Sequence, residues 1–313
     1  MLNKFKFLST VLVIFLIIFT FDPGFAFTEI KFAVVSDPHV SFPDETVTDA
    51  FKLGKKSMPL LENTVAELNK VKDLSFVLLP GDVTQDGEPW NVDELRKTLD
   101  EFKAPYFITL GNHEISPVPL PREFPGPPPA RGVSKYQFVF AFQGRGYKGS
   151  NSYNSFDPIP GLHIINLDTT KTGTWGGHLP PAQIEWLKKD LYLNKGKFII
   201  VYAHHNFVPW HVDDTNPKWK SYNLFMLDNA EQVRKIFEEA GVPLVITGHR
   251  HISTRYKEIN GVYYFVHPCT STYPMRYTIY TLTRDRLSWE VKNVPAPACL
   301  LYTSPSPRDR QKS

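Results

Sequence analysis

Short hydrophobic segments recur along the chain, and each ends in polar residues or glycine. They cover residues 32–35, 76–79, 106–110, 162–167, 198–202 and 244–247, and they are rich in Val, Ile and Phe. Within each segment the hydrophobic residues are continuous, which is typical of strands that are buried on both faces. We therefore expect these segments to be the central strands of the fold.

Amphipathic stretches with a helical period lie between several of these segments. In residues 181–193, Ile184, Leu187 and Leu191 fall on one face, and a second stretch, residues 229–240, ends at Gly241. Strands that alternate with helices in this way indicate an α/β fold. Hairpin-like strands follow, at residues 254–259 and 262–266 around an Asn-Gly turn, and then at residues 277–283 and 287–291.

Composition narrows the classes of protein that fit this pattern. The chain has 313 residues, of which 42% are hydrophobic, so it is long enough and apolar enough to bury a core. Its 35 basic and 32 acidic residues give a net charge of +3 and no broad basic surface, so we expect no nucleic-acid polymer as a partner. The 2 Cys exclude a disulfide framework and a Cys-only zinc site, whereas 10 His leave room for a metal held by His, Asp, Glu or Asn.

Residues 1–26 have the pattern of an export signal. Lys4 and Lys6 precede a hydrophobic run over residues 7–21, and the small residue Ala26 marks the expected cleavage point. The run is shorter than the ~20 residues that a membrane-spanning helix needs, so we expect a cleaved signal peptide and a periplasmic or extracellular protein. An uncleaved N-terminal membrane anchor is the alternative.

Residues 299–313 do not fit the end of a folded domain. The stretch from Cys299 to Ser313 resembles a translated sequencing adapter. We expect the natural chain to depart from this sequence near Ala298, so that residues 27–298 form one domain whose native C-terminus is missing. A native disordered tail rich in Ser, Pro and Arg is the alternative.

Each of five predicted strands ends in side chains of the kind that bind metals. Residues two apart in an extended segment point to the same side, so both members of a DxH or HxH pair can reach one site. Polar residues at the carboxyl ends of such strands converge on one crevice. Gly81, Gly111 and Gly248 are expected to allow the sharp turns that direct these side chains inward. The polar residues are Asp37, His39, Asp82, Asn112, His113, Glu114, His204, His205, His249 and His251.

The order of these groups, DxH, GD, GNHE, H and GHxH, resembles that of the calcineurin-like metallophosphoesterase superfamily over residues 31–251. The resemblance implies a four-layer α/β/β/α sandwich, in which two mixed sheets are flanked by helices, and a site for two metal ions. By that resemblance, Asp37, His39, Asp82 and His251 would hold one metal, and Asp82, Asn112, His204 and His249 the second, with Asp82 bridging.

Three neighbouring residues receive roles by the same resemblance or stay open. His204 is preferred over His205 as the ligand because the ligand in the family directly follows the strand. His113 resembles the histidine that donates a proton to the leaving oxygen or stabilises charge on the phosphate. Glu114 could orient His113, pair with a cation, or make structural hydrogen bonds.

The predicted site suits hydrolysis of phosphate esters. Two cations, of Mn, Fe, Zn or Co for a ligand set without thiolate, lower the pKa of a bridging water and neutralise charge during in-line displacement. A histidine suits the protonation of an alkoxide leaving group near neutral pH. We therefore expect an exported, metal-dependent hydrolase in which a metal-bridging hydroxide attacks a phosphodiester of a small molecule.

Further motifs bear on the type of ester. Gln85 stands where purple acid phosphatases carry a ligand tyrosine, which argues against that type of iron site. Residues 166–169, 176–180 and 183–187 resemble bacterial cyclic-nucleotide and glycerophosphodiester phosphodiesterases. A phosphomonoesterase on the same site, or a non-catalytic binding module that keeps the scaffold, is the alternative. The sequence does not indicate an oligomeric state. Candidate substrate contacts are Arg250, His205, His178 and Trp210.

Overall fold

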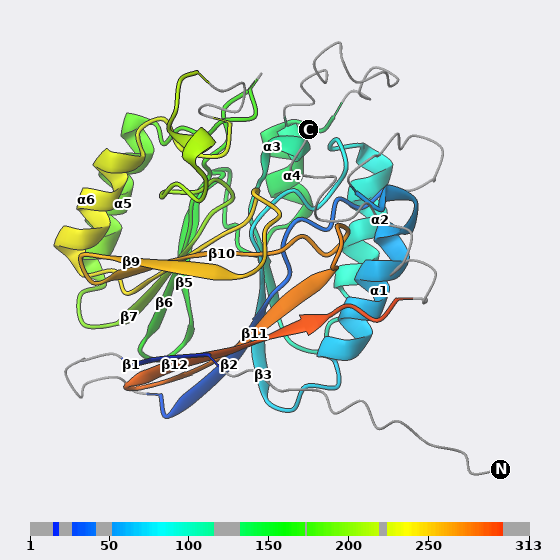
Figure 1. Ribbon diagram of the computed structural model, residues 1–313, viewed down its shortest axis with the longest axis horizontal. Coiled ribbons are helices and arrows are strands. Elements are labelled where there is room, and N and C mark those ends of the chain that lie inside the picture. Colours follow the sequence, from blue (N-terminus) through cyan, green and yellow to red (C-terminus); the bar gives the residue numbers. More distant parts are fainter. Residues whose placement is uncertain are drawn as a thin grey trace.

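The computed structural model describes residues 15–18, 27–41, 52–115, 132–172, 174–218 and 224–296. Two six-stranded mixed sheets pack against each other between two layers of helices (Figure 1). This arrangement confirms the predicted α/β/β/α sandwich. Residues 299–313 and most of the predicted export signal lie outside the described residues.

The first sheet combines a parallel half with an antiparallel half. β2, β3 and β4 run parallel, β11 and β12 form a hairpin that pairs with β2, and β1 pairs with the outer edge of β12. β1 comes from the predicted export signal, and no strand was expected there. In spatial order the strands are β1 (Phe15–Ile18), β12 (Arg286–Asn293), β11 (Arg276–Thr283), β2 (Glu29–Val34), β3 (Leu74–Leu79) and β4 (Tyr106–Ile108).

The second sheet has four parallel strands at its centre. An antiparallel strand closes each edge, and the edge strand β9 forms the predicted Asn-Gly hairpin with β10. In spatial order the strands are β5 (Asn154–Ile159), β6 (Leu162–Asn166), β7 (Phe198–Tyr202), β8 (Leu244–Thr247), β10 (Val262–Val266) and β9 (Arg255–Ile259).

Helices cover the outer face of each sheet, with α1 and α2 on one flank and α5 and α6 on the other (Figure 1). α5 matches the predicted residues 181–193, and α6 ends at Gly241, which adopts a φ of 67° that suits glycine at a helix end. The α-helices are α1 (Ser57–Leu68), α2 (Pro89–Leu99), α3 (Asn112–Ile115), α4 (Lys135–Ala141), α5 (Pro181–Leu193) and α6 (Ala230–Ala240), with 3-10 turns η2 (Gly54–Lys56) and η3 (Val212–Asp214).

Neighbouring residues of the central strands enter different cores. In β2, Phe32 and Val34 point into the core between the sheets, whereas Ala33 points into the core under α1 and α2. In β7, Phe198 points into the core between the sheets and Ile199 into the core under α5 and α6. Burial on both faces explains why the runs 32–35 and 198–202 are hydrophobic at every position.

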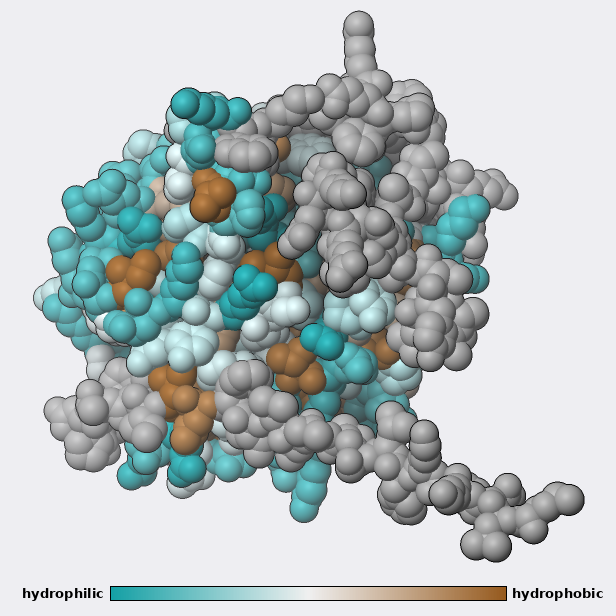
Figure 2. All heavy atoms as spheres, in the orientation of Figure 1, coloured by the Kyte–Doolittle hydropathy of each residue, from teal (hydrophilic) through white to brown (hydrophobic). Residues whose placement is uncertain are grey.

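A helix that crosses a membrane must be both long and apolar. None of the helices in the described ranges is both long and apolar enough to cross a bilayer. On the face that Figure 2 shows, hydrophobic residues are scattered among hydrophilic ones and form no single large patch. Exposed hydrophobic residues that occur singly are normal for a folded domain.

Candidate metal centre

The candidate ligands lie directly after the carboxyl ends of β2, β3, β7 and β8 and at the start of α3, where parallel strands of both sheets end together. Several of them have left-handed backbones: φ is 49° at Asp37, 43° at His39, 49° at Asp82, 69° at His249 and 51° at His251. These turns direct alternate side chains into one small, almost fully buried volume. The sequence-predicted residues are therefore brought together as expected.

One group of candidate ligands joins the ends of β2 and β8. The ligand atoms of Asp37, His39, Asp82 and His251 all lie within 4.8 Å of one another. The Nε2 atoms of His39 and His251 are 3.0 Å apart, and His251 Nε2 lies 3.4 Å from Asp37 Oδ1. Asp37 also accepts a backbone hydrogen bond from His249 N at 2.9 Å, which ties the two loops together.

A second group surrounds His204. Its Nε2 lies 3.0 Å from Asn112 Oδ1, 2.9 Å from His249 Nδ1 and 3.2 Å from Asp82 Oδ2. The other ring nitrogens face backbone carbonyls: His204 Nδ1 is 2.9 Å from Pro80 O, and His249 Nε2 is 2.7 Å from Leu224 O. Carbonyls of this kind fix the proton on the outer nitrogen and leave a lone pair on the inner one.

These tautomers give the second group the donor set of a cation site. When both rings are neutral, two imidazole lone pairs, an amide oxygen and a carboxylate oxygen face one another, and none of the four atoms carries a proton to share. Burial alone would lower the pKa of His204, but the carboxylate of Asp82 raises it to about 9. Without a metal, these atoms therefore favour a proton on His204 Nε2. A metal ion at the same place would bind all four atoms, so the residues fit a metal.

Asp82 lies between the two groups. Its Oδ2 is 3.7 Å from His39 Nε2, 3.2 Å from His204 Nε2 and 3.9 Å from His249 Nδ1. Burial opposes ionisation, but His204 and His113 hold the pKa of this carboxyl well below its usual value. A carboxylate oxygen that faces both groups has the position required of a bridging ligand.

His113 lies beside these groups without facing their centres. Its backbone N donates to Asp82 Oδ1 at 2.9 Å, and its Nδ1 lies 2.5 Å from Gln85 O and 3.3 Å from Asp86 Oδ1. Burial and Lys52 oppose protonation of this ring, yet the carboxylates of Asp82 and Asp86 raise its pKa above the usual value. Nε2, which lies 3.3 Å from Lys52 Nζ, is thus the ring nitrogen that could face a substrate.

Glu114 has a structural role at this site. Its buried carboxylate accepts backbone hydrogen bonds from Asp82 N at 2.9 Å, Thr84 N at 2.9 Å and Gly111 N at 2.7 Å. Burial raises the pKa of Glu114 to about 7. The carboxylate joins the loop after β3 to the loop after β4, and it neither orients the His113 ring nor pairs with a cation among the described residues.

Two of the three predicted glycine turns have a different cause from the one expected. Of these three glycines, only Gly81 has a left-handed backbone, with φ at 83°. A Cβ atom at Gly111 would lie 2.2 Å from Asp82 Oδ1, and one at Gly248 would lie 2.5 Å from Asp37 Oδ2. These two positions therefore need glycine for close approach to the carboxylates and not for the turn itself.

Neither His205 nor Cys269 is suited to bind a metal, although each lies close to candidate ligands. His205 accepts from Thr169 Oγ1 at 2.8 Å and donates to Trp175 O at 2.7 Å, so both ring nitrogens are used. The Cys269 thiol donates to Asp37 O at 2.9 Å, and burial raises its pKa to about 12. The geometry favours His204 over His205 as the ligand.

The motifs that resemble phosphodiesterases hold this region in place. Gln183 accepts from Asp168 N at 3.0 Å and donates to Asp168 O at 2.8 Å, which fixes the loop that carries Thr169. A Cβ atom at Gly177 would lie 2.7 Å from the His205 ring, so glycine allows this loop to pack on the histidine. The motifs therefore support the ligand layer from outside.

The predicted substrate contacts find other partners. His205 is fully buried, which corrects the expectation that it contacts substrate. His178 Nδ1 pairs with Asp228 at 2.5 Å, and Trp210 Nε1 donates to Asn206 at 2.9 Å. Arg250 lies 4.0 Å above the Phe225 ring and 3.4 Å from Asp214. Of these four residues, Arg250 alone directly follows a candidate ligand and keeps a partly exposed side chain.

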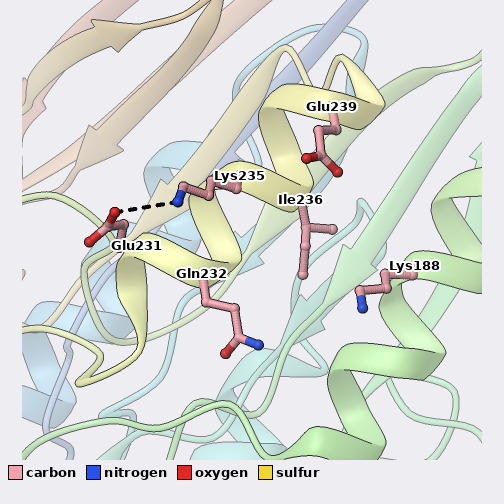
Figure 3. Close-up of a pocket in the computed structure, with 6 residues that line it drawn as sticks. All are labelled: Lys188, Glu231, Gln232, Lys235, Ile236 and Glu239. Atoms are coloured by element: carbon pink, nitrogen blue, oxygen red, sulfur yellow. Dashed lines mark ion pairs between the residues drawn. The ribbon is translucent and has the colours of Figure 1, made fainter.

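A surface pocket between α5 and α6 is separate from this site (Figure 3). It is lined by Lys188 of α5 and by residues of α6, including Glu231 and Lys235, which form an ion pair of 3.5 Å. Both side chains of that pair are mostly exposed. Solvated charges on two helices offer neither a metal site nor a catalytic group.

Lys52 is the residue near the centre that the sequence reasoning missed. Its Nζ lies 3.0 Å from His39 Nδ1 and 3.3 Å from His113 Nε2. No motif surrounds it, and a single lysine after a polar stretch gives no signal of a site. Its position depends on how the chain enters η2 after β2, which is a tertiary feature.

Comparisons with known proteins agree with this geometry. A model of the calcineurin-like phosphoesterase family matches residues 30–253. The chain is 24% identical over 243 residues to the 3',5'-cyclic adenosine monophosphate phosphodiesterase CpdA of Haemophilus influenzae, which covers 77% of this chain and 76% of that protein. It is 23% identical to the probable glycerophosphodiester phosphodiesterase GpdQ of Arcobacter nitrofigilis, over 55% of each protein. Purple acid phosphatase 18 of Arabidopsis thaliana is 27% identical over 58% of this chain and 39% of its own.

Two solved structures show the same fold. GAP50, the anchor in the inner membrane complex of Plasmodium, matches with a TM-score of 0.53 and 14% identity over 85% of each chain. A putative 5'-nucleotidase from Staphylococcus aureus matches with a TM-score of 0.52 and 16% identity over 91% of this chain and 57% of its own. The family match covers strands of both sheets, from β2 to β8, and all candidate ligands, and the chain therefore belongs to the calcineurin-like phosphoesterase family.

Proposed function

We propose that this protein hydrolyses phosphodiesters of small molecules with two metal ions bound at the candidate centre. The observation that carries the proposal is the convergence of imidazole nitrogens on Asp82 Oδ2, which lies 3.2 Å from His204 Nε2 and 3.7 Å from His39 Nε2. Buried lone pairs that face one another are costly unless a cation binds them.

The ligand set proposed from the sequence fits the two groups. Asp37, His39, Asp82 and His251 form the first, and Asp82, Asn112, His204 and His249 form the second. Bound cations would polarise the phosphoryl oxygens, neutralise charge as it develops and make water a stronger nucleophile at neutral pH. Oxygen and imidazole ligands without thiolate suit Mn, Fe, Zn or Co.

His113 is the proposed proton donor, or a group that stabilises charge on the phosphate. Gln85 O accepts from Nδ1 and Asp86 lies on the same side, so these two groups orient the ring and favour its protonated form. The hydrogen bond from His113 N to Asp82 Oδ1 fixes the ring next to the bridging carboxylate. An imidazolium at this position can protonate the leaving oxygen as the P–O bond breaks.

The relatives include both phosphodiesterases and phosphatases, so a phosphomonoesterase is the alternative to the proposed phosphodiesterase. The cyclic-nucleotide and glycerophosphodiester phosphodiesterases support diesters as substrates, and the purple acid phosphatases support a phosphomonoesterase on the same site. The chain spans 76% of the Haemophilus relative but 55% of the Arcobacter one, so the activity of the whole protein is part of the proposal. We favour the diester because residues 166–169, 176–180 and 183–187 resemble diesterases.

We also propose that the protein is exported. Lys4 and Lys6 followed by the hydrophobic run over residues 7–21 support this location. The substrates would then be phosphate esters outside the cytoplasm. An uncleaved N-terminal segment would give a membrane-anchored form instead.

Hydrolysis of two chromogenic esters tests the function. The protein is loaded with Mn, Zn, Fe or Co, and the rates on bis(p-nitrophenyl) phosphate and p-nitrophenyl phosphate are compared. We expect the diester to be the better substrate and Asp82→Ala and His113→Ala each to lower kcat by at least ~100-fold, as loss of a metal-binding or acid group does. Inactivity on both esters with metal bound would favour the binding module, and full activity in Asp82→Ala would refute the metal assignment.

A further inference from the structure

One cationic side chain reaches the candidate centre and has no part in the ligand set. Lys52 lies just before η2, and its half-buried side chain places Nζ 3.0 Å from His39 Nδ1 and 3.3 Å from His113 Nε2. The rings of His39 and His113 meet edge to face, with centroids 4.6 Å apart. The ammonium group therefore lies between a candidate ligand and the proposed proton donor.

The tautomers of the two rings limit what Lys52 can bond. His113 Nδ1 faces Gln85 O at 2.5 Å and donates to it, so Nε2 of the neutral ring can accept from the ammonium group. His39 faces the other ligands through Nε2. When that nitrogen holds a metal, Nδ1 carries the proton and cannot accept from Lys52. The ammonium group then has three N–H donors and one acceptor on these two rings while His113 is neutral, and none once His113 is protonated.

We propose that Lys52 binds a non-bridging oxygen of the substrate phosphoryl group beside His113, and that it determines how well the site accepts a dianionic phosphate. The inference rests on the proposed function and deepens it, because it names the residue that sets the balance between monoesters and diesters. Lysine binds phosphate as a compact charge with three donors.

Charge explains why this residue would act on specificity. A phosphomonoester carries about two negative charges near neutral pH, whereas a diester carries one. Loss of a nearby positive charge weakens the interaction with the dianion more than that with the monoanion. Lys52 should therefore contribute more to hydrolysis of monoesters and to binding of inorganic phosphate than to hydrolysis of diesters.

The experiment compares the metal-loaded wild type with Lys52→Met, which keeps the length and removes the charge, and with Lys52→Arg, which keeps the charge. Lys55→Ala is the matched control, because Lys55 is an exposed lysine of η2 three residues away. The readouts are the Kd of inorganic phosphate by calorimetry, the metal content by mass spectrometry, and kcat/KM on the two nitrophenyl esters.

We expect Lys52→Met to keep its metal and to bind phosphate about 10- to 100-fold more weakly, the effect of losing a charged hydrogen bond. Its kcat/KM on the monoester should fall by more than that on the diester, while Lys52→Arg stays within a few-fold of the wild type and Lys55→Ala is unchanged. Unchanged phosphate affinity, an equal fall on both esters, or loss of metal in Lys52→Met would each overturn the inference. If the wild type hydrolyses neither ester, the proposed function fails, and the phosphate affinity alone decides the role of Lys52.

Discussion

Backbone strain is concentrated at the residues that carry the candidate ligands. In the described part of the chain, eight residues other than glycine have positive φ, and five of them are Asp37, His39, Asp82, His249 and His251. A left-handed backbone costs of the order of 1 kcal/mol for a residue with a Cβ atom. The surrounding structure must hold these residues in place, and metal binding would offset part of the cost.

Glu114 is the residue whose removal should test this support. Its carboxylate accepts the backbone N–H groups of Asp82, Thr84 and Gly111. Because Glu114→Ala leaves these buried donors without a partner, we expect it to lower the free energy of unfolding by about 2–4 kcal/mol and to weaken metal binding. Urea denaturation and metal titration measure the two effects.

Glu67→Ala provides the control for that substitution. Glu67 lies on α1 and makes one exposed ion pair with Lys70, so its loss should change stability by less than ~1 kcal/mol. Equal effects of the two substitutions would show that the Glu114 hydrogen bonds do not support the site.

The sequence predicted which residues converge at the centre better than it predicted the contacts that hold them there. DxH, GNHE and GHxH each follow a hydrophobic strand, so their convergence could be inferred from alternation and strand polarity alone. The close approach of Gly111 to Asp82 could not, because it depends on the distance between two loops from different strands. Lys52 escaped prediction for the same reason.

At the scale of elements, the predicted strands include those buried on both faces and those of the two later hairpins. β7 and β8 match the expected residues, and β2, β3, β4 and β6 differ from them only at their ends. β5 was missed because none of its residues is fully buried and it contains Pro158, so it lacks a continuous hydrophobic run. Propensity and periodicity do not identify a strand whose residues are all at least partly exposed.

A charged cluster joins β5 and β6 to α5. His163 of β6 pairs through Nδ1 with Asp157 of β5 at 2.6 Å and through Nε2 with Asp190 of α5 at 2.8 Å. Lys197, in the turn after α5, donates to the other oxygen of Asp157. Partial burial raises the pKa of Asp157, but the hydrogen bonds from Lys197 and His163 outweigh it and hold this pKa below its usual value.

This cluster should make stability depend on pH in a defined direction. Because the pKa of Asp157 is lower in the folded state, its carboxylate stabilises the fold above about pH 4, and the contribution is lost as the pH falls through the folded-state pKa. We expect Asp157→Asn to be less stable than the wild type at pH 7 by up to about 1 kcal/mol, since the group is partly exposed. The difference should shrink below pH 4 in urea denaturation.

Glu185→Gln is the control for this pH dependence. Glu185 forms an exposed i,i+3 pair with Lys188 on α5, so its substitution should have little effect at either pH. A destabilisation by Asp157→Asn that is the same at pH 3.5 and pH 7 would contradict the role of the ionised carboxylate.

At the scale of the whole molecule, the candidate centre and β1 lie at opposite ends of the first sheet. The centre follows the end of β2, whereas β1 pairs with the part of β12 next to its turn with β11. That turn lies beside the start of β2, because Thr283 pairs with Glu29. β1 therefore makes no direct contact with the ligands, and its loss should not disturb them.

Removal of residues 1–26 should therefore preserve the fold and the site. β1 contributes the buried side chain of Ile17, which pairs with Leu287, so we expect a loss of about 1.5–3 kcal/mol in the free energy of unfolding. Metal affinity and hydrolytic activity should match those of the full chain. Urea denaturation, metal titration and the diester assay on a chain that begins at Phe27 measure these quantities.

The same truncation bears on the proposal of export. If residues 1–26 are a cleaved signal, the intact mass of protein recovered outside the cytoplasm should correspond to a chain that begins at Phe27, and that chain must function without β1. If the truncated protein does not fold or does not bind metal, β1 is an essential part of the mature sheet. Cleavage after Ala26 would then be incompatible with a working enzyme, and the uncleaved form would be the one to consider.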